Sequence, residues 1–138
     1  MRRLMPTVVV VLTAGALGAP VAWAGSPHFV SNTVQASRTD TSVTVVGKEA
    51  GLGDEEQVSI LLTGTAECIN PGQKHPKAAN KESVSAEGTF PVQNGKAEFE
   101  LTLTASFSPE CSPPMTVVFS NVTVSDTTNG ISKNLGSF

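Results

Sequence analysis

The chain has 138 residues, with nine Lys or Arg against twelve Asp or Glu and a formal net charge of −3. This acidic balance argues against nucleic-acid binding, which needs a basic surface, and against docking on anionic membranes. The length fits a single domain that is large enough to bury a hydrophobic core.

The first 24 residues have the pattern of a cleaved secretory signal. Arg2 and Arg3 form a positive start, residues 8–17 are apolar, and Ala22-Trp23-Ala24 is a small-x-small cleavage site. The apolar run is shorter than the ~20 residues of a membrane span, which favours cleavage over an uncleaved anchor. We therefore predict a secreted, extracellular protein whose mature domain covers residues 25–138.

The export route follows from the same segment. Arg2-Arg3 also occurs in twin-arginine signals, but the positive region is short and Met5-Pro6 follows at once, so the general secretory route is favoured. No Cys lies near the cleavage site and residues 134–138 form no apolar tail. We expect a free product without a membrane anchor.

The mature sequence alternates apolar and polar residues with period two, which predicts strands. A first strand is expected within residues 25–36, a second over Thr41–Lys48 and a third over Gln57–Cys68. In the third, every second residue from Val58 to Cys68 is apolar or small, and the opposite face is mostly polar. That pattern is typical of a half-buried strand.

Residues 68–81 form a candidate binding loop. They contain His75 and three basic residues, Lys74, Lys77 and Lys81, but no acid, and prolines stiffen the segment. A long, stiffened loop of one charge sign is a plausible recognition element, and its partner would be an acidic extracellular polymer or protein. The alternative is a solvated connection between strands.

A hairpin follows, with Ser83–Val92 and Lys96–Phe107 on either side of Asn94-Gly95. This dipeptide favours the type I′ turn, and a one-residue slip would bring Glu into the core, so the register is well specified. The expected pairs are Gln93 with Lys96, Val92 with Ala97, Phe90 with Phe99, Gly88 with Leu101, Ala86 with Leu103, and Val84 with Ala105.

Cys68 and Cys111 are the two cysteines of the chain. In an oxidising compartment an even count indicates a disulfide, here expected to hold two sheets together and to contribute roughly 4 kcal/mol by loop closure. Two free thiols, or a redox or metal-binding pair, are the alternatives. A redox pair usually has C-x-x-C spacing, which is absent.

The last strands are expected over Met115–Thr127 and Ile131–Phe138, joined by a turn at Asn129-Gly130. The alternation changes phase near Ser120-Asn121, which indicates a β-bulge or two apolar faces. About seven strands without helical periodicity predict an all-β fold, a single antiparallel β-sandwich of immunoglobulin-like type.

The sequence contains no catalytic signature. It lacks G-x-S-x-G, H-E-x-x-H and a glycine-rich phosphate loop, and His28 and His75 are its two histidines. Residues 126–129 lack the charge and spacing of a calcium loop, and Pro27 rules out a terminal copper site at His28. We predict a protein without catalytic residues, cofactor or metal.

Three stretches carry a resemblance: residues 66–72, residues 75–77 and residues 122–130. They resemble a group of small secreted actinobacterial proteins of unknown function, and the likeness extends over most of the mature chain. The resemblance implies a bacterial extracellular setting and no particular activity.

The expected function is therefore that of a secreted, non-enzymatic β-sandwich that binds a partner or contributes to an extracellular surface. One alternative is a small-molecule carrier of neocarzinostatin-like type, which an apolar cleft between the sheets would favour. The other is an inhibitor of extracellular proteases, for which residues 74–77 would supply a protruding loop.

Overall fold

The computed structural model of the protein describes residues 26–70 and 80–138. The predicted signal peptide lies outside the described residues. In this part of the chain, no helix has the length and the apolar character that crossing a membrane requires. The elements are β1 (His28–Phe29), η2 (Ser31–Thr33), β2 (Gln35–Arg38), β3 (Ser42–Ala50), β4 (Gln57–Ile69), β5 (Lys81–Gln93), β6 (Lys96–Thr104), β7 (Thr116–Asp126) and β8 (Ile131–Gly136).

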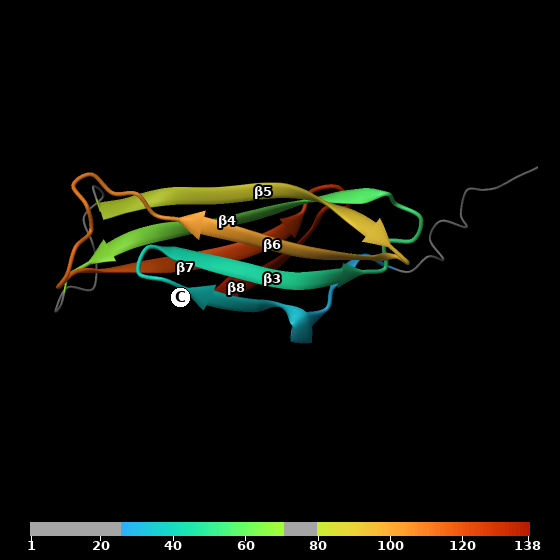
Figure 1. Cartoon of the computed structure of the whole chain (residues 1–138), viewed down its shortest axis with the longest axis horizontal. Helices are drawn as coiled ribbons and strands as arrows, with labels where there is room; N and C mark the ends of the chain where they lie inside the picture. The colour runs from blue at the N-terminus through green and yellow to red at the C-terminus, as the bar shows by residue number, and fades with distance from the viewer. Residues whose placement is uncertain (1–25, 71–79) are drawn as a thin grey trace, which may run out of the picture.

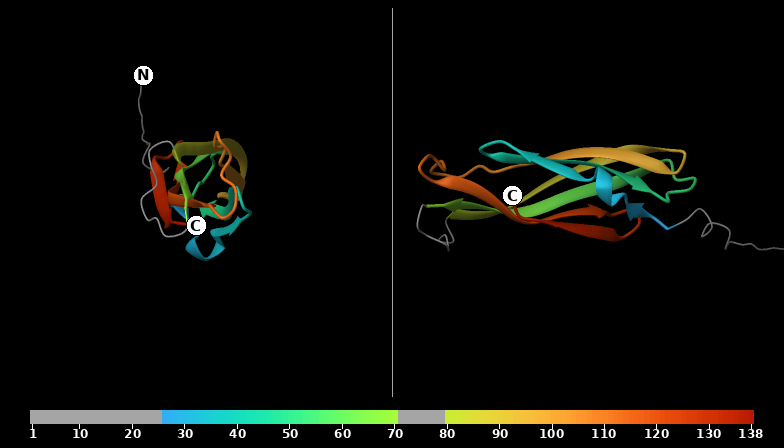
Figure 2. Two further views of the ribbon diagram at one scale, coloured as in Figure 1. Left: turned by 90° about the vertical axis from the view of Figure 1, so that its left-hand side faces the viewer. Right: turned by 90° about the horizontal axis from the view of Figure 1, so that it is seen from below.

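The eight strands form one antiparallel sheet with the order β1-β3-β6-β5-β4-β7-β8, and β2 also pairs with β3. The sheet curls into an elongated, nearly closed barrel whose strands run along the long axis (Figure 1), and the end-on view in Figure 2 shows them around a common centre. The predicted two-sheet, immunoglobulin-like sandwich is therefore wrong. A short β5–β6 ladder joins the two halves into one sheet.

The barrel interior is a packed core. Inward residues of β3, β4, β6 and β7 fill it, as side chains do in small barrels. The fully buried apolar residues are Val43, Val45, Val58, Ile60, Leu62, Ala66, Leu103, Phe119, Val122 and Val124.

Most expected strands exist, and two local features bear on the expectations. The expected first strand is divided by η2 into β1 and β2. In β7 the change of phase is a β-bulge: the register against β4 shifts between Thr63 and Thr65, and Asn121 opposite has a positive φ of 52°. The bulge returns alternate side chains to the core on both sides of Asn121, which confirms one of the two interpretations.

The predicted disulfide between Cys68 and Cys111 is present, with a Cα–Cα distance of 5.8 Å. Cys68 lies on the buried face of β4, as its phase predicts. Cys111 lies in the connection between β6 and β7. The bond therefore fastens this connection to β4 and does not bridge two sheets.

Where β2 faces β7, no ladder joins the two strands within the described residues, and the Arg38 side chain of β2 connects them. The Arg38 guanidinium donates from Nη2 to the carbonyl of Val117 at 2.8 Å and lies 5.9 Å from the centre of the Phe119 ring. On β8, Lys133 pairs in register with the buried Val124, so it is on the inward side of an edge strand. Inward charges of this kind discourage edge-to-edge pairing with other chains.

Candidate functional site

The β5–β6 hairpin is the part of the barrel where backbone pairing is incomplete. Its turn is Asn94-Gly95, with φ values of 55° and 75° that match the predicted type I′ turn. The ladder contains the pairs Gln93 with Lys96 and Val92 with Ala97, and then ends. The four expected pairs beyond these are not formed, so that part of the predicted register is wrong.

Pro91 explains why the ladder ends where it does. Hydrogen-bonded pairs recur at every second residue of an antiparallel ladder, so after Gln93 the next donor toward β6 would be residue 91. The amide of Val92 points the other way and donates to Glu56 O at 2.9 Å. Because proline has no N–H, the next β5–β6 hydrogen bond lacks its donor.

Beyond Pro91 the two strands separate along the barrel (Figure 1), and the contacts between them come from side chains. The rings of Phe90 and Phe99 meet edge to face with centroids 6.4 Å apart. A methyl group placed on Gly88 would lie 3.4 Å from Leu101 Cδ2. Two of the expected pairs therefore lie side by side although their backbones are not paired: Phe90 with Phe99, and Gly88 with Leu101.

At the end far from the turn, a side chain of β5 forms a hydrogen bond with the chain that follows β6. The backbone N–H of Ser106 donates to Glu82 Oε1 at 2.6 Å, where a β5 carbonyl would stand in a continuous ladder. We call the stretch between the two closed ends the open seam: residues 83–90 of β5 facing residues 98–104 of β6. Along it the two strand edges face each other without ladder pairs.

The open seam is lined by apolar side chains that the core does not fully cover. No residue of β5 is fully buried, whereas β4 beside it has fully buried residues at every second position over most of its length. The half-buried apolar residues along the seam are Val84, Ala86, Phe90 and Leu101, with Val92 and Phe107 beyond its two ends.

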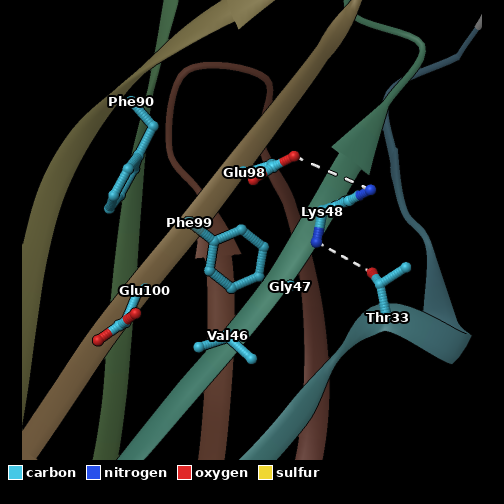
Figure 3. A pocket seen from close by; sticks show the side chains of 8 residues that line it. All are labelled: Thr33, Val46, Gly47, Lys48, Phe90, Glu98, Phe99 and Glu100. Carbon is cyan, nitrogen blue, oxygen red and sulfur yellow. Dashed lines mark hydrogen bonds and ion pairs between the residues drawn. The ribbon is translucent and has the colours of Figure 1, made fainter.

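A hollow of about 430 Å³ lies beside the seam, over β6 and β3. Figure 3 shows that Phe90 and Phe99 flank it, with Glu98 and Glu100 from β6 and Lys48 from β3. A second hollow shares Lys48 and Glu98 with the first and reaches Pro91. The surface is therefore concave from the Pro91 end of the seam to its aromatic centre.

Acidic side chains border the open seam on the outside of the barrel. We call Glu87 of β5 with Glu98 and Glu100 of β6 the acidic rim; all three are exposed. Lys48 Nζ lies 3.9 Å from Glu98 Oε2, and both side chains are half or more exposed. Within the described ranges neither Glu87 nor Glu100 forms an ion pair.

A second cluster of polar groups lies inside the barrel, where Glu49 of β3 meets Asp126 of β7. Both residues are completely buried. Asp126 accepts from the backbone amides of Thr128 and Asn129 at 2.8 and 2.9 Å and from Asn129 Nδ2 at 2.6 Å. Neither carboxylate oxygen of Glu49 has a donor within the described residues, so Glu49 needs a proton of its own to form a hydrogen bond.

The pKa values of the two carboxyls move in opposite directions. Burial, the hydrogen bond to Asp126 and the charges of Asp126 and Glu55 raise the pKa of Glu49 to about 9. Burial also acts to raise the pKa of Asp126, but hydrogen bonds from Glu49, Asn129 and Thr128 outweigh it and lower that pKa. At neutral pH the pair therefore holds one proton, with Glu49 as donor and Asp126 as acceptor.

Both carboxyl groups are enclosed by the barrel and expose no surface to solvent. The described residues also contain no group of three or more His, Cys, Asp or Glu side chains arranged to hold a metal ion.

Of the predicted binding loop, Lys74, His75 and Lys77 lie outside the described residues. Lys81 begins β5, and its Nζ lies 3.7 Å from Glu67 Oε2 on the neighbouring strand β4. His28, in β1, is exposed, and its Nδ1 lies 2.8 Å from the carbonyl of Ser26.

The period-two pattern predicts a continuous β5–β6 ladder and not the open seam, although a signal for the seam exists in the sequence. A proline within an alternating segment indicates an edge strand or an interrupted ladder, and Pro91 stands three residues before Asn94 of the turn. A comparison of the chain with protein-family models, curated proteins and solved structures finds no match.

Proposed function

We propose that the protein is a secreted, non-enzymatic binding protein that takes up an extended polypeptide segment at the open seam. The observation that supports this most strongly is the end of the β5–β6 ladder at Pro91, although both strands continue. An unpaired strand edge with apolar side chains beside it is the surface to which proteins add a peptide strand.

Natural sheets usually protect their edges with Lys, Pro or a bulge. On β5 such residues stand near the ends, at Lys81 and Pro91, and residues 83–90 contain none of them. The seam is held by side-chain contacts and by the hydrogen bond between Glu82 and Ser106. Separating β5 from β6 to admit a further strand therefore breaks fewer hydrogen bonds than separating two strands that are joined by a continuous ladder.

The proposal also holds that the protein is non-enzymatic and secreted. The first part rests on the side chains of the seam, and the second on signs of an extracellular compartment. The strand residues that form the seam, 83–90 and 98–104, present Ser, Thr and Glu side chains and include no histidine, the side chain that most readily acts as a general base near neutral pH. The disulfide is consistent with an oxidising extracellular compartment. The signal pattern and the resemblance to small secreted actinobacterial proteins support the same setting.

A small-molecule carrier is the second candidate. The hollow beside Phe90 and Phe99 has a volume of about 430 Å³, within the range of ligand pockets. The barrel interior is filled, so a carried molecule would lie at this surface hollow and not inside the barrel.

The test is a selection of displayed random peptides on the disulfide-bonded protein, followed by backbone N-methylation of an enriched peptide. Methylating every second amide removes the donors that face one side of an added strand. The methyl groups can be placed on the odd-numbered or on the even-numbered amides, and we call these choices the two frames. A peptide paired with one strand edge should lose at least tenfold in affinity in one frame. A peptide paired with both edges should lose at least tenfold in both frames. Tolerance of methylation in both frames, or no enriched peptide, contradicts the proposal.

A further inference from the structure

We infer that the segment bound at the open seam alternates apolar residues with Lys or Arg, the basic side chains facing the acidic rim. The inference rests on the proposed function and names the chemistry of the partner. It follows from the two faces of the seam, because successive side chains of a strand point to opposite sides.

The inward face of the seam calls for apolar side chains. A strand lying between β5 and β6 would direct every second residue toward Val84, Ala86, Phe90 and Leu101, which are half-buried in the free protein. Apolar residues there would remove this surface from water, and a charged residue would lose its hydration without gaining a partner.

The outward face calls for positive charge. The side chains that border it are Ser83, Ser85, Glu87 and Thr89 on β5 and Glu98, Glu100, Thr102 and Thr104 on β6. Three of these eight are acidic and none is basic. Lys48 lies near Glu98, so Glu87 and Glu100 carry the charge that remains without an ion-pair partner among the described residues.

The expected size of the effect is modest. Exposed ion pairs are weak, so each Lys of the segment should improve the dissociation constant about two- to fivefold. Exposed charges are also screened over about 8 Å at physiological ionic strength, so the advantage should shrink as salt is added.

The experiment compares three synthetic ten-residue peptides that share the same Val residues and alternate them with Lys, Gln or Glu. Their affinities for the full-length, disulfide-bonded protein are measured in 50 mM and 500 mM NaCl. We expect the Lys peptide to bind best and the Glu peptide worst, with the order compressed at high salt. The double variant Glu87→Gln/Glu100→Gln should bind all three with similar affinity.

A matched control separates the acidic rim from the net charge of the protein. The double variant Asp40→Asn/Glu56→Gln also removes two negative charges, but from exposed positions outside the seam. It should keep the order of affinities of the three peptides. Equal effects of the two double variants would overturn the rim as the source of selectivity. Equal binding of the Gln and Lys peptides would refute this inference and leave the proposed function standing, whereas no binding of any peptide would count against both.

Discussion

Glu49 and Asp126 give the interior of the barrel a dependence on pH. Glu55 adds negative charge to the surroundings of the pair, and Asn129 and Thr128 supply hydrogen-bond donors to Asp126. Glu49 keeps its proton in the folded protein up to a pKa of about 9, whereas the unfolded chain releases it near 4.5. Folding therefore binds a proton between these two pH values.

The first prediction is that the free energy of unfolding falls as pH rises from about 5 to 9. The unfolded state binds fewer protons than the folded state in this window, so stability decreases with pH, by up to about 1.4 kcal/mol per pH unit from this group. Asp126 acts in the opposite sense: its lowered pKa gives stability that is lost as pH falls through the folded value. Urea unfolding at a series of pH values should show a maximum in the acidic range.

The second prediction assigns that slope to one residue. Glu49→Gln keeps a donor for Asp126 but has no proton to lose, so the variant should lose most of the decline between pH 5 and 9. At pH 7 it should be at least as stable as the parent. Glu56→Gln, a nearby exposed change, should keep the parent's slope. A steep decline that persists in Glu49→Gln would place the titrating group elsewhere.

The sequence indicates the burial of Glu49 but not its contact with Asp126. The alternation of Val43, Val45 and Gly47 places Glu49 on the same buried face, although the expected strand ended at Lys48. That Asp126 faces it depends on how β3 and β7 approach each other across the barrel. Local periodicity contains no information on such a contact.

Among the elements, the β5–β6 hairpin shows where pattern reasoning succeeds and where it fails. Asn94-Gly95 predicts the turn and the first two pairs, because turn chemistry acts on neighbouring residues. The alternation also predicts which side chains meet, as Phe90 and Phe99 do. It does not predict that the backbones separate, which depends on the missing N–H of Pro91 and on the curvature of the barrel.

The third prediction concerns Pro91→Thr, which restores the missing donor. The amide of residue 91 should pair with Glu98 and become protected from hydrogen exchange, and the selected seam peptide should bind more weakly. The added hydrogen bond contributes about 0.5–1.5 kcal/mol, and the lost rigidity of proline costs about 0.4–1 kcal/mol, so overall stability should change little. Thr89→Val, at a position that already has an N–H, should leave the pattern unchanged. Continued fast exchange at residue 91 would contradict this explanation of the ladder's end.

At the scale of the whole molecule, the sequence predicts an all-β protein with the correct disulfide but not the closure of its sheet. Alternating strands bury one face equally well in a sandwich and in a barrel. The difference lies in which edges pair, and here two ladder pairs of the hairpin join halves that would otherwise form separate sheets.

The fourth prediction is that removing the disulfide by Cys68→Ser/Cys111→Ser lowers the free energy of unfolding by about 2–5 kcal/mol. The bond spans a sequence separation of 43 and holds the β6–β7 connection against β4, so its loss frees a long loop in the unfolded chain. Denaturant unfolding of the variant and of the reduced parent should agree. A loss below 1 kcal/mol in both would show that the connection is held by other contacts.

The open seam itself is tested most directly by residue-resolved hydrogen exchange along β5. The register with β4 directs the amides of Val84, Ala86, Gly88 and Phe90 toward β4, and those of Ser83, Ser85, Glu87 and Thr89 toward the seam. We predict slow exchange for the first set and fast exchange for the second in the free protein, with the second set slowed when a seam peptide binds. Equal protection of both sets in the free protein would mean that the β5 edge is already paired, and would contradict the account.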